Sequence, residues 1–479
     1  MKDAAKRVQA VVEDLIGVDL GDQRLDFRAG RIVRRLAAKP AVGFPQALVT
    51  SAELEGFYRF LGNEKVSAAA LLKPHAEATI GRIIEHGTAL AIHDTTALRF
   101  GGRGREGLGE LSRAGDMFFA HICLAVSADG LRDPLGVLGI HTRARDGSPT
   151  PTMLIKQGVK ASLTREMPSE QDRWREMVVD VEKNLARQAL LIHVMDSEPD
   201  DYALLCLMQN EKHRFVLRST SDRRLDAGAM GCKPNEKTRQ FMSCVEVRAE
   251  REVKLSRRGR GVVGGGSKRT KPRDGRMATL LFSAAKLVFE RPKTARKDLP
   301  NTVSVNMVYA KEKDPPDGLE PVDWLLLTSE PIDTDEQILE VVDVYRARWL
   351  IEEYFSALKT GCAFEERQLE SKSTLTKALA LFAPVAWVLL RMRASSRSPI
   401  EAPVSNVLTP IQITILKSKT GIPLTKRSTA AEAYLAVARL GGHIKNNGAP
   451  GWRVLGRGYH ELLTLEVGYK IAKRETCDR

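Results

Sequence analysis

The stretch Tyr345-Arg-Ala-Arg348-Trp-Leu-Ile-Glu352-Glu-Tyr-Phe-Ser-Ala-Leu-Lys359 carries the strongest indication of fold and chemistry in this chain. At about 100° per residue, its reactive residues share an arc of roughly 60° on an α-helix: Tyr345, Arg348, Glu352 and Lys359. A neighbouring stripe is apolar and predicts a buried flank: Val344, Ile351, Phe355 and Leu358. A carboxylate can bind a metal ion, while guanidinium, ammonium and phenol groups bind phosphate. This pattern suits a helix at a cleft that works on a nucleic-acid backbone, although one such helix taken alone is more often a solvated face.

Composition favours a polyanionic partner. The chain has 479 residues and 43% hydrophobic content, enough for roughly two to four domains. Its 74 Lys and Arg residues exceed its 60 acidic residues, giving a net charge of +14. This charge does not distinguish DNA from RNA or a membrane surface. The six cysteines form no C-x-x-C pair, so we expect reduced thiols of a cytosolic protein and neither a zinc site nor a disulfide framework.

Membrane insertion is not expected. The N-terminus, Met-Lys-Asp-Ala-Ala-Lys-Arg, lacks the apolar stretch of a signal peptide. The most apolar segment, residues 378–390, is short for a membrane span and is interrupted by Pro384, so we expect it to be a buried helix. The sequence thus predicts a soluble cytoplasmic protein with no membrane partner.

The N-terminal region, residues 1–70, is expected to be helical and basic. The segment 22–39 predicts a helix with four arginines on one face and an apolar flank on another: Arg24, Arg28, Arg31 and Arg35 against Leu25, Ile32, Val33 and Leu36. Such a row is commonly a solvated face, but it is dense enough to lie along a phosphate backbone. A second helix is expected over 51–61, where the aromatic residues of Phe57-Tyr58-Arg59-Phe60 would fill a small core.

The middle of the chain predicts an α/β sheet. Three strands are expected first, followed by helix, strand, helix and strand, which is the order of a ribonuclease-H-like core. Asp94 and Asp196 each end a predicted strand, and sites in open sheets form at the carboxyl ends of strands. The predicted strands cover 90–94, 118–126, 135–142, 190–195 and 214–218, and the helices about 168–187 and 200–209.

Residues 220–330 predict a β-rich insertion before the final core helix. Strands are expected over 303–309 and 324–328. The tract from Arg251 to Arg276 holds many Lys, Arg and Gly residues, so it is expected to form a flexible basic tip. A disordered loop that orders on nucleic acid is the alternative for this tract. The chain from about 371 onward is expected to be helical.

Three acidic residues are candidate ligands for divalent cations. Mg²⁺ prefers a few carboxylate oxygens and keeps positions for water and phosphate. A single aspartate at a strand end is usually a turn or helix cap, with a functional prior of roughly one in ten. Asp94 and Asp196 together with Glu352 form a rarer combination. Glu353 points about 100° away from the stripe, so Glu352 is preferred.

The chain resembles the DDE cut-and-paste transposases of bacterial insertion sequences, in the subgroup marked by Tyr-x2-Arg-x3-Glu-x6-Lys. Tyr345, Arg348, Glu352 and Lys359 complete that signature. Asp94-Thr-Thr and Asp196-Ser-Glu-Pro-Asp200 match the two aspartate motifs of the family. Further similarity extends along nearly the whole chain, at Leu20–Arg24, Tyr58–Phe60, Trp324–Glu330 and Ala436–Gly442.

This resemblance implies a domain organisation and an activity. It implies a DNA-recognition domain (1–70), a ribonuclease-H-like catalytic domain (71–369) with the insertion at 220–330, and a helical dimerisation domain (370–479). Mg²⁺, with Mn²⁺ as a substitute, would act through Asp94, Asp196 and Glu352. Water nicks the transposon end, the freed 3′-OH forms a hairpin on the opposite strand, and the reopened ends join target DNA. The implied partners are double-stranded DNA (inverted-repeat ends and target) and a second copy of the chain, in the bacterial cytoplasm at the nucleoid.

The resemblance also implies roles in DNA binding. Tyr345, Arg348 and Lys359 would hold the strand near the hairpin with help from Arg218, and Trp324 would stack on a base turned out of the duplex. Read without the family, Trp324 heads an apolar strand and would pack in a core. Ser197 and Ser356 stand where some relatives carry charged residues.

Two alternatives remain open. One is a catalytically silent transposase derivative that acts as a DNA-binding regulator, which the basic helix and net charge would suit. The other is a structure-selective nuclease that cuts without joining.

Overall fold

The computed structural model describes residues 17–477, except for short stretches, and separates into two compact units. Unit 1 comprises Met1–Ser148, Val179–Leu190 and Trp349–Arg479, and unit 2 comprises Pro149–Val178 and Leu191–Arg348. Both units combine helices with β-strands, which confirms the predicted α/β class; the ribonuclease-H-like assignment stays a prediction. The stretches left out are 49, 103, 112–114, 145–153, 155–156, 159–170, 256–260, 263–268, 271–273, 398–401 and 445–448.

The strands of unit 1 form an antiparallel group around β3 (Gly115–Ser127). It pairs with β1 (Thr88–Phe100), β4 (Pro134–Arg143) and the short β2 (Gly109–Leu111). Apolar side chains at Leu90 and Ile92 are fully buried. The predicted strands are present, but β1 continues to Phe100, so Asp94 lies inside a strand and the prediction that it ends one is wrong.

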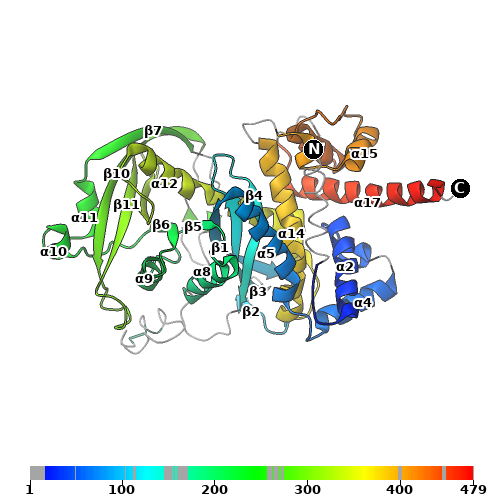
Figure 1. The fold of residues 1–479 in the computed structure, drawn as a ribbon, viewed down its shortest axis with the longest axis horizontal. Helices are drawn as coiled ribbons and strands as arrows, with labels where there is room; N and C mark the ends of the chain where they lie inside the picture. Colours follow the sequence, from blue (N-terminus) through cyan, green and yellow to red (C-terminus); the bar gives the residue numbers. More distant parts are fainter. Residues whose placement is uncertain are drawn as a thin grey trace. The chain divides into compact units, whose positions relative to one another are not determined.

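Helices α5 (Ala68–His86) and α14 (Lys372–Arg397) both pack against β4 and against each other (Figure 1). The indole Nε1 of Trp387 on α14 donates to the carbonyl of Pro134, and Arg82 on α5 stacks over the same indole. Among the described residues, one helix, α14, is apolar and long enough to cross a membrane, but 78% of its most apolar window is buried inside the protein. The predicted buried helix over 378–390 is therefore confirmed.

The N-terminal helices of unit 1 pack on one another and on α14. They are α2 (Gln23–Ala38), α3 (Phe44–Ala47) and α4 (Ser51–Gly62). The expected apolar flank of α2 is buried, as are Phe57 and Phe60 on α4, whereas Tyr58 is exposed. Both predicted helices are thus confirmed within about two residues.

The C-terminal part of unit 1 is helical, as predicted. Beyond α14 it contains the short helix η3 (Val404–Asn406), α15 (Pro410–Thr420), α16 (Ala430–Leu440) and α17 (Trp452–Cys477). Glycines on α17 let it lie directly on its neighbours. A Cβ added at Gly458 would lie 1.8 Å from the carbonyl oxygen of Val437 on α16, and one at Gly456 would lie 2.2 Å from that of Gly361.

We expect Gly458→Ala to destabilise the protein by about 1–3 kcal/mol, because the added methyl meets backbone that cannot rotate away. This loss exceeds the gain of up to about 1 kcal/mol that alanine brings to a helix interior. Gly468→Ala on the same helix meets nothing within 4 Å, so it should be neutral or stabilising. Thermal unfolding of both variants checks the difference, and equal melting temperatures would contradict the close packing of α16 and α17.

The strands of unit 2 form a mixed sheet in the order β5, β6, β12, β11, β10, β7. Strand β5 (Leu190–Met195) runs parallel to β6 (Arg214–Ser219). The next pairs are antiparallel: β12 (Asp323–Thr328), β11 (Thr302–Glu312), β10 (Arg276–Glu290) and β7 (Val247–Leu255). Two antiparallel strands of two residues each lie between β7 and β10 in the chain: β8 (Gly261–Val262) and β9 (Arg269–Thr270).

The insertion is β-rich, as predicted, but the ends of its basic tract are not a loop. Arg251 lies on β7 and forms two hydrogen bonds of 2.9 and 2.8 Å to Asp343. Arg276 begins β10 and pairs with the buried Glu312. Much of the tract between them lies outside the described residues. The prediction of a flexible tip is therefore wrong for Arg251 and Arg276. Each lies on a strand and pairs with an acidic residue of another element.

Helices of unit 2 cover this sheet. Helix α12 (Asp335–Ala347) packs on β6, β7 and β10–β12, and α9 (Tyr202–Asn210) packs on β11 (Figure 1). The core between α9 and the sheet includes Leu205, Leu217 and Leu327. Two further helices are short, α10 (Ala227–Met230) and α11 (Thr238–Ser243). Helix α8 (Asp172–Leu185) has its first half assigned to unit 2 and its second half to unit 1.

The signature stretch is not one α-helix, which corrects the prediction. Helix α12 ends at Ala347, and Arg348 caps it with a backbone N–H to the carbonyl of Tyr345. Helix α13 (Trp349–Ser356) follows, and Lys359 lies in a π-helical turn, η1 (Ala357–Gly361), before the short helix η2 (Phe364–Glu366). Because the π-helical turn changes the number of residues per turn, the arc calculated for an ideal helix does not hold as far as Lys359. The apolar stripe is buried as expected at all four of its positions: Val344, Ile351, Phe355 and Leu358.

Candidate functional site

In unit 2, cationic and phenolic side chains gather around Asp196, which directly follows β5 as predicted. The Tyr345 hydroxyl donates to Asp196 Oδ1 at 3.3 Å. Arg218 Nε lies 2.6 Å from the same oxygen, an ion-pair distance without hydrogen-bond alignment. Arg348 Nη2 lies 3.8 Å from Oδ2. Strand β6 and the end of α12 thus bring three predicted site residues to one carboxylate.

Tyr345 is buried within this group, although the sequence placed it on the cleft side of the stripe. Burial and the nearby Asp196 charge raise the pKa of its hydroxyl, so it stays protonated and remains a donor at neutral pH. Trp324 on β12 contacts the Tyr345 ring edge to face, with centroids 5.5 Å apart. The indole of Trp324 is half-buried. This exposure lies between that of a core residue and that of a freely accessible stacking residue, the two roles considered from the sequence.

Asp200 supports the loop that follows β6. Its Oδ2 accepts hydrogen bonds from the backbone N–H groups of Thr220 and Ser221, and its Oδ1 lies 2.7 Å from Arg223 Nη2. Burial alone would raise the pKa of Asp200, but the Arg223 charge and these hydrogen bonds outweigh it and lower that pKa. This second aspartate of the motif is therefore a buried structural anion whose carboxylate is paired with Arg223 and the loop backbone.

In unit 1, the elements that carry Asp94 and Glu352 pack together, since α13 lies against β1. Both side chains are partly exposed. Asp94 Oδ1 accepts from the N–H of Thr95 at 2.7 Å. Glu353 is held elsewhere, with Oε1 2.7 Å from Arg397 and Oε2 3.7 Å from Arg393. These ion pairs are consistent with preferring Glu352.

Lys359 is directed toward β1 of the same unit. Its Nζ donates to the carbonyl of Ala97 at 2.6 Å and lies 3.7 Å from Glu365. Burial lowers the pKa of this ammonium, and the Glu365 charge partly offsets the effect. The π-helical turn thus places the lysine three residues along the strand from Asp94.

The three candidate metal ligands are divided between the units, Asp94 and Glu352 in unit 1 and Asp196 in unit 2. Within the described ranges, no group of three or more His, Cys, Asp or Glu side chains is arranged to hold a metal ion. Carboxylate oxygens are the donors that Mg²⁺ prefers, so the chemistry of the three residues fits the ion. Their assembly into one site stays a prediction.

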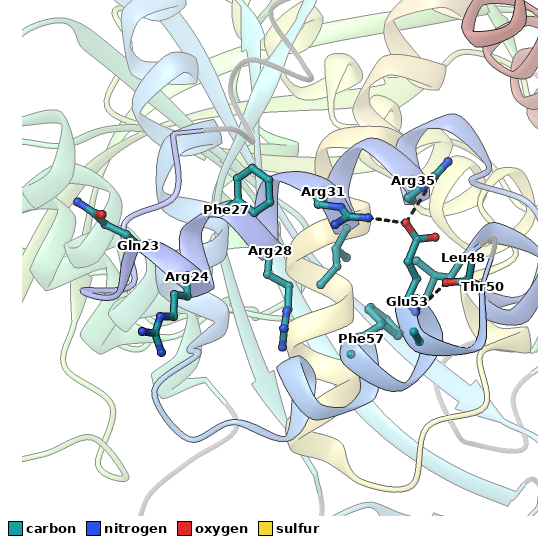
Figure 2. Close-up of a pocket in the computed structure, with 13 residues that line it drawn as sticks. Gln23, Arg24, Phe27, Arg28, Arg31, Arg35, Leu48, Thr50, Glu53 and Phe57 are labelled. Carbon is teal, nitrogen blue, oxygen red and sulfur yellow. Dashed lines mark hydrogen bonds and ion pairs between the residues drawn. The ribbon is translucent and has the colours of Figure 1, made fainter. Parts of the chain in front are cut away.

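The arginine row of α2 lines a hollow of about 680 Å³ between α2 and α4 (Figure 2). All four predicted arginines contribute to it, which confirms that they share a face: Arg24, Arg28, Arg31 and Arg35. Glu53 on α4 lies opposite and accepts from Arg31 at 2.8 Å and from Arg35 at 3.1 Å. Phe27, beside the row, is exposed.

Sequence reasoning missed several partners of these residues. Arg223, the partner of Asp200, was not predicted as a site residue. The two residues lie far apart in the sequence, so no local spacing indicates that they pair. Glu53 carries a weak signal, since it stands three residues after the N-cap Thr50, where glutamate commonly closes a capping box. Neither its direction nor its contact with α2 follows from that spacing.

In a comparison with known protein families, residues 8–66 match the family described as transposase DNA-binding. The matched range contains α2, α3 and α4 and therefore the arginine-lined hollow. The match supports a transposase role and DNA as the partner. It does not extend to Asp94, Asp196 or Glu352.

Proposed function

We propose that this chain is a DDE-type transposase that cleaves transposon ends by metal-dependent phosphoryl transfer and joins the 3′-OH ends to target DNA. The observation that carries the proposal is the DNA-binding match at residues 8–66 in a chain that also holds the complete Tyr345, Arg348, Glu352 and Lys359 signature. The gathering of Tyr345, Arg348 and Arg218 around Asp196 supports it further.

Asp94, Asp196 and Glu352 would hold the ions. Bound Mg²⁺ would supply stabilisation of the entering and leaving oxygens of an in-line displacement. In the proposed first step, water attacks the scissile phosphorus, its P–O3′ bond breaks, and the 3′ oxygen leaves as a hydroxyl. In this proposal all three carboxylates act at one phosphodiester.

The remaining residues would bind and orient the strand. Arg218 and Arg348 pair with Asp196, and each guanidinium can also donate to a phosphate oxygen. Tyr345 keeps its proton and donates to an anionic oxygen. Trp324, against Tyr345, offers part of an aromatic face to a base turned out of the duplex.

Strand transfer separates this proposal from a nuclease on the same core. With precut ends that carry a free 3′-OH, we expect Mg²⁺-dependent joining to a target duplex, because the 3′-OH takes the place of water in the same displacement. Inverted repeats from the DNA that borders the coding region supply the ends, and ends with a 3′-deoxy terminus are the control. Cleavage without joining would favour a nuclease, and DNA binding without either would favour the silent regulator.

A further inference from the structure

Glu53 occupies a position in the arginine row that a phosphate would take. Arg31 Nη2 and Arg35 Nη2 both approach a single oxygen, Glu53 Oε1, at 2.8 and 3.1 Å. Two guanidinium groups that converge on one anionic oxygen form the arrangement that binds a non-bridging phosphate oxygen. Figure 2 shows both arginines reaching toward Glu53, with Arg24 and Arg28 nearer the start of α2.

Glu53 lies in the first turn of α4, and its carboxylate contacts another helix. Thr50 caps α4 by accepting from the N–H of Glu53, and a glutamate at this position commonly returns the bond to the N-cap backbone. Glu432 in α16 and Gln337 in α12 do so. In α4 the Glu53 carboxylate reaches across to α2, where it pairs with Arg31 and Arg35.

The ion pairs of Glu53 with Arg31 and Arg35 can be replaced by pairs with a phosphate at little cost in stability. The side chains of Arg31 and Arg35 are 55% and 41% exposed, and ion pairs between exposed groups contribute little net stability. Glu53 is 17% exposed, so its charge lies within the hollow. A DNA phosphate entering the hollow meets this negative charge as well as the arginines.

We propose that Glu53 is an internal counter-anion of the DNA-binding surface, which a phosphate of the DNA backbone displaces from Arg31 and Arg35. This inference rests on the proposed function, since it takes the N-terminal helices as the DNA-binding part. Glu53 thereby weakens binding to DNA in general, and the arginine pair contacts phosphate only when the carboxylate gives way.

The test compares Glu53→Gln with the full-length wild-type chain on a short duplex of arbitrary sequence, by fluorescence anisotropy from about 50 to 200 mM salt. The glutamine that this substitution introduces can close the capping box as Gln337 does, so α4 should remain folded. We expect about five- to tenfold tighter binding, because one negative charge next to the phosphate is removed. The slope of log affinity against log salt should stay unchanged, since the same phosphate contacts form.

Two control variants make the result specific. Glu55→Gln removes the same charge from α4, but Glu55 pairs with Arg59 and lies outside the hollow, so affinity should change less than about twofold. In an Arg31→Gln/Arg35→Gln background, Glu53→Gln should give no gain, and this background alone should flatten the salt slope by about 0.9 per lost contact.

Three outcomes would overturn the proposal. They are an unchanged affinity for Glu53→Gln, an equal gain from Glu55→Gln, or a steeper salt slope in Glu53→Gln. The last would mean that the arginines stay on Glu53 in the native complex. A failure of the proposed function would look different. The wild-type protein itself would then not bind DNA with a salt-dependent affinity.

Discussion

Asp196→Asn is expected to lower Mg²⁺-dependent cleavage of transposon ends by roughly 10²- to 10³-fold or more, with DNA binding largely retained. The substitution preserves shape but removes the charge that a hard cation requires, and single catalytic groups commonly carry effects of this size. Asp94→Asn and Glu352→Gln should give losses of the same order. Cleavage of a labelled inverted-repeat end, with binding measured by gel shift, separates chemistry from affinity.

Neighbouring carboxylates provide the controls for these variants. Asp201→Asn lies in the same loop as Asp196 but pairs with Arg175, and Glu353→Gln follows Glu352 but pairs with Arg393 and Arg397. Both should cleave at close to the wild-type rate. Retained cleavage in Asp94→Asn, Asp196→Asn or Glu352→Gln would remove that residue from the proposed site. A loss in Glu353→Gln equal to that in Glu352→Gln would show that the assignment between the two glutamates is wrong.

Periodicity predicted the secondary structure well wherever one face of an element is buried. The α2 helix, the strands around β3 and the apolar stripe of Ile351 and Phe355 follow from spacing alone, because burial selects for that spacing. The same reasoning ended β1 at Asp94, since the apolar run stops there. The strand continues because it pairs with β3 through Phe100, and long-range pairing of this kind is invisible in a local window.

The site was predicted less completely, for reasons of backbone geometry and long-range contact. An ideal helix through residues 345–359 does not allow for the cap at Arg348 or the π-helical turn at Lys359. The spacing of the side chains is the same with or without these changes of backbone geometry, so it did not predict them. The group around Asp196 was anticipated only in part: resemblance suggested Arg218, whereas the contact of Tyr345 with Asp196 depends on how α12 packs on the sheet.

Asp200→Asn is expected to destabilise the protein by about 3–5 kcal/mol at neutral pH, because it leaves the Arg223 guanidinium buried without its counter-charge. Both side chains are almost fully buried, at 3% exposure for Asp200 and 6% for Arg223. Asparagine keeps an oxygen for the N–H groups of Thr220 and Ser221, so the variant tests mainly the charge. Chemical denaturation gives the free energy of unfolding. As a control, Glu250→Gln disrupts the half-exposed pair with Lys313 in the same unit and should change it by at most about 1 kcal/mol.

The pH dependence of Asp200→Asn distinguishes a lost charge from lost packing. The pKa of Asp200 is lowered in the folded protein from an ordinary value of 3.8, so its stabilisation is fully present above that value and is lost as pH falls through the folded pKa. The difference between wild type and Asp200→Asn should therefore stay constant from neutral pH to about pH 4.5 and shrink below it. A difference that persists unchanged into strong acid would mean that the variant disturbs packing, and that the ion pair with Arg223 is not what fixes the loop after β6.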